Sequence, residues 1–270
     1  MRELPQRPLS EFFDHIDPIY VLGTTYSISP AFFEGLVFPQ IGKENLRRCL
    51  LLCDRTGFQR AVVEASALRQ VSREYMIART PAKYSFHSKV WLLIGEEQVV
   101  LLVGSGNLTQ SGFMDNAELF DTVILEKGGN HRKVVEDIVV FLSGIRSLWT
   151  GEETERLLIV ETLREMQEVL AAFAREMPTD DESDVRFLTN FHGPLSTQFQ
   201  EYFSKNGTIH LAVPYFGNSI TGLLSLKNTL SPVRIRVFPA IGARSVAQWC
   251  VRHVEEAKWN IQDFGIPVRF

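Results

Sequence analysis

The residues with the clearest capacity for chemistry lie between positions 87 and 118. His87 and Lys89 stand two residues apart, and Ser105 and Asn107 follow them in a glycine-rich segment. In a strand, His87 and Lys89 would project from the same face, because successive side chains alternate. An imidazole can attack phosphorus, an ammonium supplies compact positive charge, and a carboxamide donates hydrogen bonds without competing as a nucleophile. These residue types predict a cradle for a phosphate group.

The spacing of these residues resembles the phospholipase D superfamily, whose signature is H-x-K followed by G-[GS]-x-N. Here the second element reads Gly104-Ser-Gly-Asn107 and continues as Leu-Thr-Gln-Ser-Gly112. Asn116-Ala-Glu118 adds the N-x-E pattern that is common in nuclease-like members of that family. Three spaced elements therefore match the family pattern, which makes the resemblance specific. A lone H-x-K would not be specific.

One position departs from the larger family motif. That motif has an acidic residue five positions after the lysine, where this chain has Ile94, and Glu96 and Glu97 lie in the following turn. The variant is more similar to the tyrosyl-DNA phosphodiesterase branch, which lacks this acid, than to lipid-cleaving members. The departure leaves the nucleophile in place and puts in doubt the supporting role usually given to the acid.

The resemblance implies a two-step phosphoryl transfer that needs neither a metal nor another cofactor. His87 would be the nucleophile or the general acid, and Lys89 and Asn107 would hold the non-bridging phosphate oxygens. Ser105 would assist them, and Glu118 is a candidate to orient a histidine across the site. In the family, a second copy of the motif supplies the second histidine.

The family's site takes one H-x-K from each of two lobes; we expect this chain to supply only the one at His87, with none in residues 185–270, and three explanations stay open. The chain could be a fragment or a split subunit whose second motif begins after Phe270. Two chains could pair about a two-fold axis and bring two copies of His87 together. The single motif could also be a relic in a binding scaffold.

Alternating strands and helices predict an α/β fold, which the resemblance specifies as a phospholipase D-like mixed β-sheet sandwiched by helices. We expect one complete lobe in residues 1–150, an acidic helix and linker in 151–184, and a second, apparently incomplete lobe in 185–270. The expected strands are 18–28, 46–53, 74–78, 85–94, 98–103, 117–125, 185–189, 208–214, 232–238 and the beginning of another at 266–270. The expected helices are 58–70, a short one after 109, 131–149, one in the acidic block, 194–203, 220–226 and 244–259.

The net charge of −4 conceals an uneven distribution. Residues 42–90 contain ten Lys or Arg against four Asp or Glu, residues 151–184 three against eleven, and residues 185–270 nine against four. The acidic block is either an ordinary solvated helix face with a polar linker or an acidic helix that repels or mimics a nucleic-acid backbone. The two basic blocks could line a phosphodiester groove.

Three cysteines are too few for a disulfide scaffold, and we interpret Cys49 and Cys53 as core thiols. The chain has neither a membrane-spanning run nor a signal-peptide pattern at its start, so we expect a cytoplasmic protein that does not bind membranes. Tyr215 and Phe216 could stack on bases, although core packing is the more ordinary role of such residues.

We therefore expect a metal-independent phosphodiesterase or nuclease that acts on DNA, more than on RNA or lipid, with no cofactor. A homodimer, a partner subunit or a further domain would supply the second histidine. Family-level association suggests a bacterial restriction or anti-phage setting. The alternative is a non-catalytic nucleic-acid-binding or assembly module of a larger nuclease or helicase complex.

Overall fold

The computed structural model describes residues 13, 16–65, 68–116, 118–149, 154–179, 185–202, 208–213, 228 and 234–239. The chain forms two compact units, residues 1–187 and 188–270. The residues of the H-x-K and G-S-x-N pattern all belong to the first unit.

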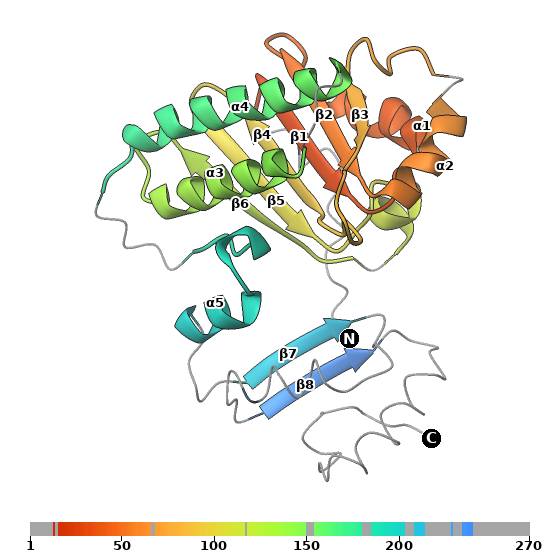
Figure 1. Ribbon diagram of the computed structural model, residues 1–270. Coiled ribbons are helices and arrows are strands. Elements are labelled where there is room, and N and C mark those ends of the chain that lie inside the picture. The colour runs from red at the N-terminus through yellow and green to blue at the C-terminus, as the bar shows by residue number, and fades with distance from the viewer. Residues whose placement is uncertain are drawn as a thin grey trace, which may run out of the picture. The chain divides into compact units, whose positions relative to one another are not determined.

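A six-stranded mixed sheet in the order β3-β2-β1-β4-β5-β6 forms the centre of the first unit (Figure 1). β1, β2 and β3 are parallel to one another, and β4, β5 and β6 continue the sheet as antiparallel neighbours. The bounds are β1 Tyr20–Thr25, β2 Arg48–Cys53, β3 Met76–Arg79, β4 Val90–Ile94, β5 Gln98–Gly104 and β6 Phe120–Glu126. The expected mixed α/β sheet flanked by helices is confirmed.

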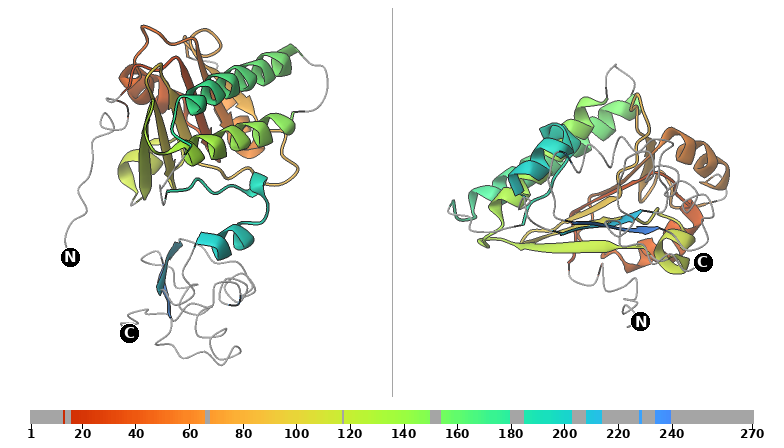
Figure 2. Two further views of the ribbon diagram at one scale, coloured as in Figure 1. Left: turned by 90° about the vertical axis from the view of Figure 1, so that its left-hand side faces the viewer. Right: turned by 90° about the horizontal axis from the view of Figure 1, so that it is seen from below.

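Helices cover both faces of this sheet, which explains why its central strands are continuous apolar runs. α3 (Arg132–Ser147) and α4 (Thr154–Arg175) lie side by side on one face (Figures 1 and 2). The other face packs against α1 (Pro30–Phe32), the short helical turns up to Gln40, and α2 (Arg55–Ala65). Leu50 and Leu52 point into the first core, and Leu51 points into the second.

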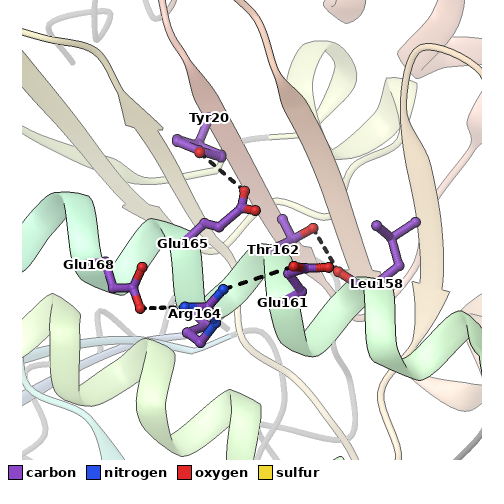
Figure 3. Close-up of polar contacts among 7 residues, drawn as sticks. All are labelled: Tyr20, Leu158, Glu161, Thr162, Arg164, Glu165 and Glu168. Carbon is purple, nitrogen blue, oxygen red and sulfur yellow. Dashed lines mark hydrogen bonds and ion pairs between the residues drawn. The ribbon is translucent and has the colours of Figure 1, made fainter.

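The acidic block contains a long amphipathic helix, as its periodicity predicts. Its apolar side is buried against the sheet and α3 through Ile159, Leu163, Met166, Leu170 and Phe173. The polar side carries ion pairs along the helix from Arg164 to Glu161 and Glu168, and the hydroxyl of Tyr20 in β1 donates to Glu165 at 3.2 Å (Figure 3). Part of the acidic surface is therefore engaged in holding α4 in place.

The strand directions place one terminus of every strand at the same edge of the sheet. These are the C-terminal ends of β1, β2, β3 and β5 and the N-terminal ends of β4 and β6. In open α/β sheets, ligands bind outside the carboxyl ends of the parallel strands. This edge, which we call the His87 edge, carries the segments around residues 25, 54, 80, 87, 105 and 119.

The described part of the second unit contains one helix and two paired strands. α5 spans Leu195–Tyr202, and β7 (Thr208–Val213) pairs in parallel with β8 (Arg234–Pro239). The expected helices 220–226 and 244–259, the strand at 266–270, and Tyr215, Phe216, Cys250 and residues 180–184 of the linker lie outside the described residues.

Two expected strands differ from the structure. Residues 185–189 form no strand; Arg186 and the backbone of Phe187 instead bind Asp137 on α3. The strand expected from Ser85 begins at Val90, so that His87 and Lys89 precede it. The helical turns of residues 30–40 were not expected from the sequence. The other elements of the first unit differ from expectation by at most five residues at their ends.

Both cysteines of the first unit are buried thiols, which confirms their interpretation as core residues. Burial raises the pKa of both, and the neighbouring carboxylate of Asp54 helps to raise that of Cys53 to about 12. No helix in the described part of the chain is long and apolar enough to cross a membrane.

Candidate active site

His87 and Lys89 lie in an irregular segment that leads into β4. The strand expectation was wrong for residues 85–89, yet the two side chains still meet: Lys89 Nζ lies 3.0 Å from His87 Nδ1 and donates to the His87 carbonyl at 3.2 Å. Lys89 is buried, whereas the ring of His87 is exposed. The pair therefore presents an accessible imidazole backed by a fixed cation.

Side chains from neighbouring strands hold this segment. Thr24, near the end of β1, accepts the Val90 N–H at 2.8 Å and shares a hydrogen bond of 3.0 Å with Ser88. The ring of Tyr26 lies against that of His87, with 5.0 Å between centroids. Hydrogen bonds of the Thr24 hydroxyl thus replace the start of the ladder that the sequence pattern predicts here, and the Tyr26 ring packs beside His87.

Burial and charge set the protonation of the pair. Partial burial lowers the pKa of His87, Lys89 lowers it further, and Asp54 opposes them. Burial also lowers the pKa of Lys89, while the carboxylate of Glu118 raises it. An imidazole with a depressed pKa is neutral near pH 7, the form that a nucleophile needs.

The glycine-rich segment follows β5 directly and lies beside the His87 segment. The Gly104 N–H donates to the carbonyl of Lys89 at 3.0 Å. Asn107 Oδ1 accepts the Ser27 N–H at 3.3 Å. This contact assigns the oxygen of the Asn107 amide to the side that faces Ser27 and the Nδ2 group to the other side. No described residue accepts a hydrogen bond from that Nδ2, so its N–H groups can serve a ligand.

Close packing of glycines shapes this turn. A Cβ on Gly112 would overlap the carbonyl oxygen of Asn107 and lie 2.6 Å from its nitrogen. The backbone of Asn107 therefore approaches residue 112 more closely than any side chain allows.

We predict that Gly112→Ala destabilises the protein by about 1–3 kcal/mol, because the new methyl group forces the Asn107 backbone to move. Thermal unfolding followed by circular dichroism measures the effect. Gly35→Ala is the matched control, since a Cβ there meets no atom within 4 Å, and it should leave the melting temperature unchanged or slightly raised. Equal melting temperatures for both variants would contradict the close approach.

Ser105 and Glu118 form the other side of the candidate site. The Ser105 hydroxyl donates to Glu118 Oε2 and accepts the Leu119 N–H at 3.0 Å. Asn116 Nδ2 donates to Glu118 Oε1 at 3.3 Å. The serine is thus locked by the loop before β6, and the carboxylate acts electrostatically on Lys89.

The structure brings all five sequence-predicted residues to the His87 edge, at the ends of β4, β5 and β6. Glu118 contacts Ser105 rather than a histidine of the described chain. Sequence reasoning missed Tyr26 and Asp54, which reach His87 or its segment from strands more than thirty residues away. Only their position directly after two buried strands could have signalled them.

A second His-x-Lys triplet, His131 to Lys133, is also present in the sequence but is not part of this site. It opens α3, after β6 has crossed to the opposite edge of the sheet. No G-S-x-N segment follows it. A cavity of about 450 Å³ also lies towards that opposite edge, around Gly95, Glu97 and Lys127.

Among the described residues, no group of three or more His, Cys, Asp or Glu side chains is placed to hold a metal ion. What the site offers a substrate is one imidazole, one ammonium and the N–H groups of Asn107. The ammonium and the Asn107 N–H groups can bind phosphate oxygens. The imidazole can act as a nucleophile towards phosphorus or as an acid towards the leaving oxygen.

No protein-family model and no curated protein sequence matches the chain. Solved structures that it resembles include two mutants of yeast tyrosyl-DNA phosphodiesterase. One gives 10% identity, a TM-score of 0.48 and coverage of 78% of this chain and 49% of that chain; the other gives 11%, 0.49, 93% and 66%. NucT from Helicobacter pylori gives 12% identity, a TM-score of 0.27 and coverage of 58% of this chain and 79% of that chain.

The chain spans about half to two-thirds of the length of the yeast structures. Likenesses of this size do not assign a function to it. What it shares with the phospholipase D superfamily is carried by its own residues: an H-x-K triplet, a G-S-x-N turn and an N-x-E carboxylate, gathered at one edge of a mixed sheet.

Proposed function

We propose that this chain is a metal-independent phosphodiesterase that cleaves DNA through a phosphohistidine intermediate. The observation that carries the proposal is the exposed His87 ring with the Lys89 ammonium 3.0 Å from its Nδ1, beside a turn that presents Asn107. Ser105 and Glu118 complete the same edge.

The proposed chemistry has two displacements at phosphorus. A histidine nitrogen forms a bond to phosphorus while the bond to the leaving oxygen breaks, and a second histidine gives that oxygen its proton. Water then attacks the phosphohistidine, the second histidine takes the proton of that water, and the bond between phosphorus and nitrogen breaks. Lys89 and Asn107 bind the non-bridging oxygens, whose negative charge grows in both transition states.

The present contact bears on which histidine role His87 takes. When Lys89 is protonated it is purely a donor, so Nδ1 of a neutral His87 accepts and the ring proton lies on Nε2. In this tautomer the proton on Nε2 blocks attack through that nitrogen, and a second proton on Nδ1 would give the imidazolium, which is the form that acts as a general acid. Attack through Nε2 becomes possible when a phosphate draws the ammonium away and the ring proton moves to Nδ1.

The second histidine comes from outside the described site in this proposal, from a dimer mate, a partner subunit or another domain. A homodimer would place two copies of the His87 edge against each other, so that one imidazole attacks and the other protonates. The Lys89 and Asn107 of each copy would then bind one phosphate from two sides.

DNA is the proposed substrate because cationic side chains surround the same edge. Arg55 follows β2, Arg79 ends β3, and Lys83 lies in the loop before His87; all three are exposed. They belong to the basic block of residues 42–90, which suits a polyanion. The proposal includes a biological role for this DNA cleavage, in a bacterial restriction or anti-phage defence system.

The test is cleavage of labelled single-stranded and double-stranded DNA in excess EDTA. We expect turnover in EDTA, together with a labelled protein that survives alkali and loses its label in acid, as a phosphohistidine does. A strict requirement for Mg²⁺ would overturn the proposal. Release of headgroups from phosphatidylcholine vesicles without DNA cleavage would overturn the substrate.

We predict that the acid limb of the pH profile lies below the ordinary histidine value of 6.5, because burial first and Lys89 second lower the pKa of His87. The neutral imidazole required for attack therefore persists as the pH falls, and activity is lost only when the depressed pKa is crossed. The profile of kcat/KM in EDTA from about pH 5 to 8 checks this. An acid limb above 6.5 would contradict it.

The second candidate function is a nucleic-acid-binding or assembly module without catalysis. It is favoured by the single copy of the full motif in the sequence. Salt-sensitive DNA binding without cleavage, both alone and in the presence of its partners, would identify this role.

A further inference from the structure

We propose that Asp54 is the residue that positions His87: it fixes the backbone leading into the imidazole and places a carboxylate beside it. This inference rests on the proposed function of His87. Asp54 stands directly after β2 and is not part of the H-x-K, G-S-x-N or N-x-E pattern.

Both carboxylate oxygens of Asp54 are committed to backbone donors. Oδ1 accepts the Thr56 N–H at 2.8 Å and so caps the first turn of α2. Oδ2 accepts the N–H of Phe86, the residue before His87, at 2.8 Å. Asp54 is buried, with 7% of its surface exposed, and its two hydrogen bonds connect the end of β2 to α2 and to the His87 segment.

The other end of the same loop is tied to the residue next to Asp54. Both the N–H and the hydroxyl of Thr80 donate to the carbonyl of Cys53, at 2.9 and 2.7 Å. Residues 80–86 therefore leave β3 and return to adjacent positions at the end of β2. Thr80 holds the end of the loop that leaves β3, whereas Asp54 holds the end that enters His87.

The charges that face His87 divide between elements. Lys89 comes from the same segment as His87, and Asp54 comes from the end of β2. Glu118, before β6, acts on Lys89, and the ring of Tyr26 packs against the imidazole. Burial raises the pKa of Asp54, but the N–H groups of Phe86 and Thr56 outweigh it and, with His87, lower the pKa overall. Asp54 is therefore ionised at neutral pH and opposes the effect of Lys89 on the ring.

The decisive experiment is an NMR titration of the His87 imidazole in the full chain without substrate. Asp54→Asn keeps one acceptor but removes the charge and one of the two anchors, so we expect His87 to titrate at lower pH than in the wild type. Thr80→Val is the matched control, because it removes a hydrogen bond from the other end of the loop and leaves the charge in place. It should leave the titration of His87 unchanged.

The two explanations of an Asp54 effect predict opposite shifts. A merely structural role would loosen the segment and hydrate the ring, which would move its pKa upwards towards the ordinary value. A titration that is unchanged or moved upwards in Asp54→Asn therefore overturns the proposal. Because the titration needs no turnover, this outcome is separate from the absence of DNA cleavage, which would overturn the proposed function instead.

Activity supplies a second readout. We expect kcat of Asp54→Asn to fall by about tenfold to a hundredfold, the range for small misplacement of a reacting group, with its acid limb moved to lower pH. Thr80→Val should retain kcat within about twofold. An equal loss of kcat in both variants would overturn the assignment to Asp54.

The wild-type protein keeps the proposal testable if Asp54→Asn does not fold. At neutral pH the Phe86 amide should exchange slowly with solvent, and its chemical shift should move when acid protonates Asp54. An amide at Phe86 that exchanges as fast as those of exposed loops would overturn the anchor.

Discussion

Replacing His87 with alanine should lower the rate of DNA cleavage by at least about 10³-fold, since it removes the group that bonds to phosphorus or protonates the leaving oxygen. The variant should fold normally. The ring is exposed, and exposed substitutions usually change the free energy of unfolding by less than about 0.5 kcal/mol. Single-turnover rates on labelled DNA in EDTA, with melting temperatures measured alongside, provide the comparison.

His131→Ala is the matched control because His131 also belongs to a His-x-Lys triplet but lies towards the opposite edge of the sheet. We expect it to cleave DNA at the wild-type rate. Undiminished cleavage by His87→Ala would contradict the site, and loss of cleavage in His131→Ala alone would move the chemistry to the other edge.

Mixing wild-type and His87→Ala chains shows where the second histidine comes from. If each site needs one His87 from each of two identical chains, random exchange in an equal mixture halves the activity of the wild-type chains. If a single chain is sufficient, that activity stays constant. The mixture thus separates a homodimeric site from one completed within the chain or by a different partner.

Most of the first unit could be predicted from local patterns. Compact apolar runs identify β2, β4 and β5, and the period of Leu163, Met166 and Leu170 identifies α4. These signals are strong because each element buries a face against a large core. The site residues were accessible for a different reason, since their types and spacing repeat a known chemical pattern.

The remainder depends on contacts between distant residues, which no local window contains. Asp54 reaches Phe86 across 32 positions, and Asn107 reaches Ser27 across 80. Residues 85–89 have the apolar and β-branched neighbours of a strand, but the Thr24 hydroxyl takes the N–H of Val90 and the ladder starts there. Tertiary hydrogen bonds thus override propensity at the same place where the site needs an exposed histidine.

In residues 185–189 a tertiary contact again overrides strand propensity, because Arg186 forms an ion pair with the buried Asp137. Removing one partner of this pair should lower the free energy of unfolding. Arg186 binds Asp137 on α3 through two hydrogen bonds of 2.9 Å, and Asp137 Oδ2 also accepts the Phe187 N–H at 3.2 Å. The Asp137 side chain is 5% exposed, against 26% for that of Arg186. Arg186→Met should therefore lower the free energy of unfolding by about 3 kcal/mol, because it removes the guanidinium that pairs with a buried carboxylate through two hydrogen bonds.

Two further variants separate this effect from a general loss of charge, with urea unfolding as the measurement for all three. Arg164→Met removes an arginine whose pairs with Glu161 and Glu168 lie on the exposed side of α4, so it should cost less than about 1 kcal/mol. The double variant Asp137→Asn/Arg186→Met should be more stable than Arg186→Met alone, since asparagine still accepts the Phe187 N–H and carries no charge to bury. If Arg186→Met and Arg164→Met lower the free energy of unfolding equally, the ion pair does not anchor the segment that follows α4. The apolar contact of Phe187 with Phe141, whose ring centroids are 5.2 Å apart, must then hold this segment.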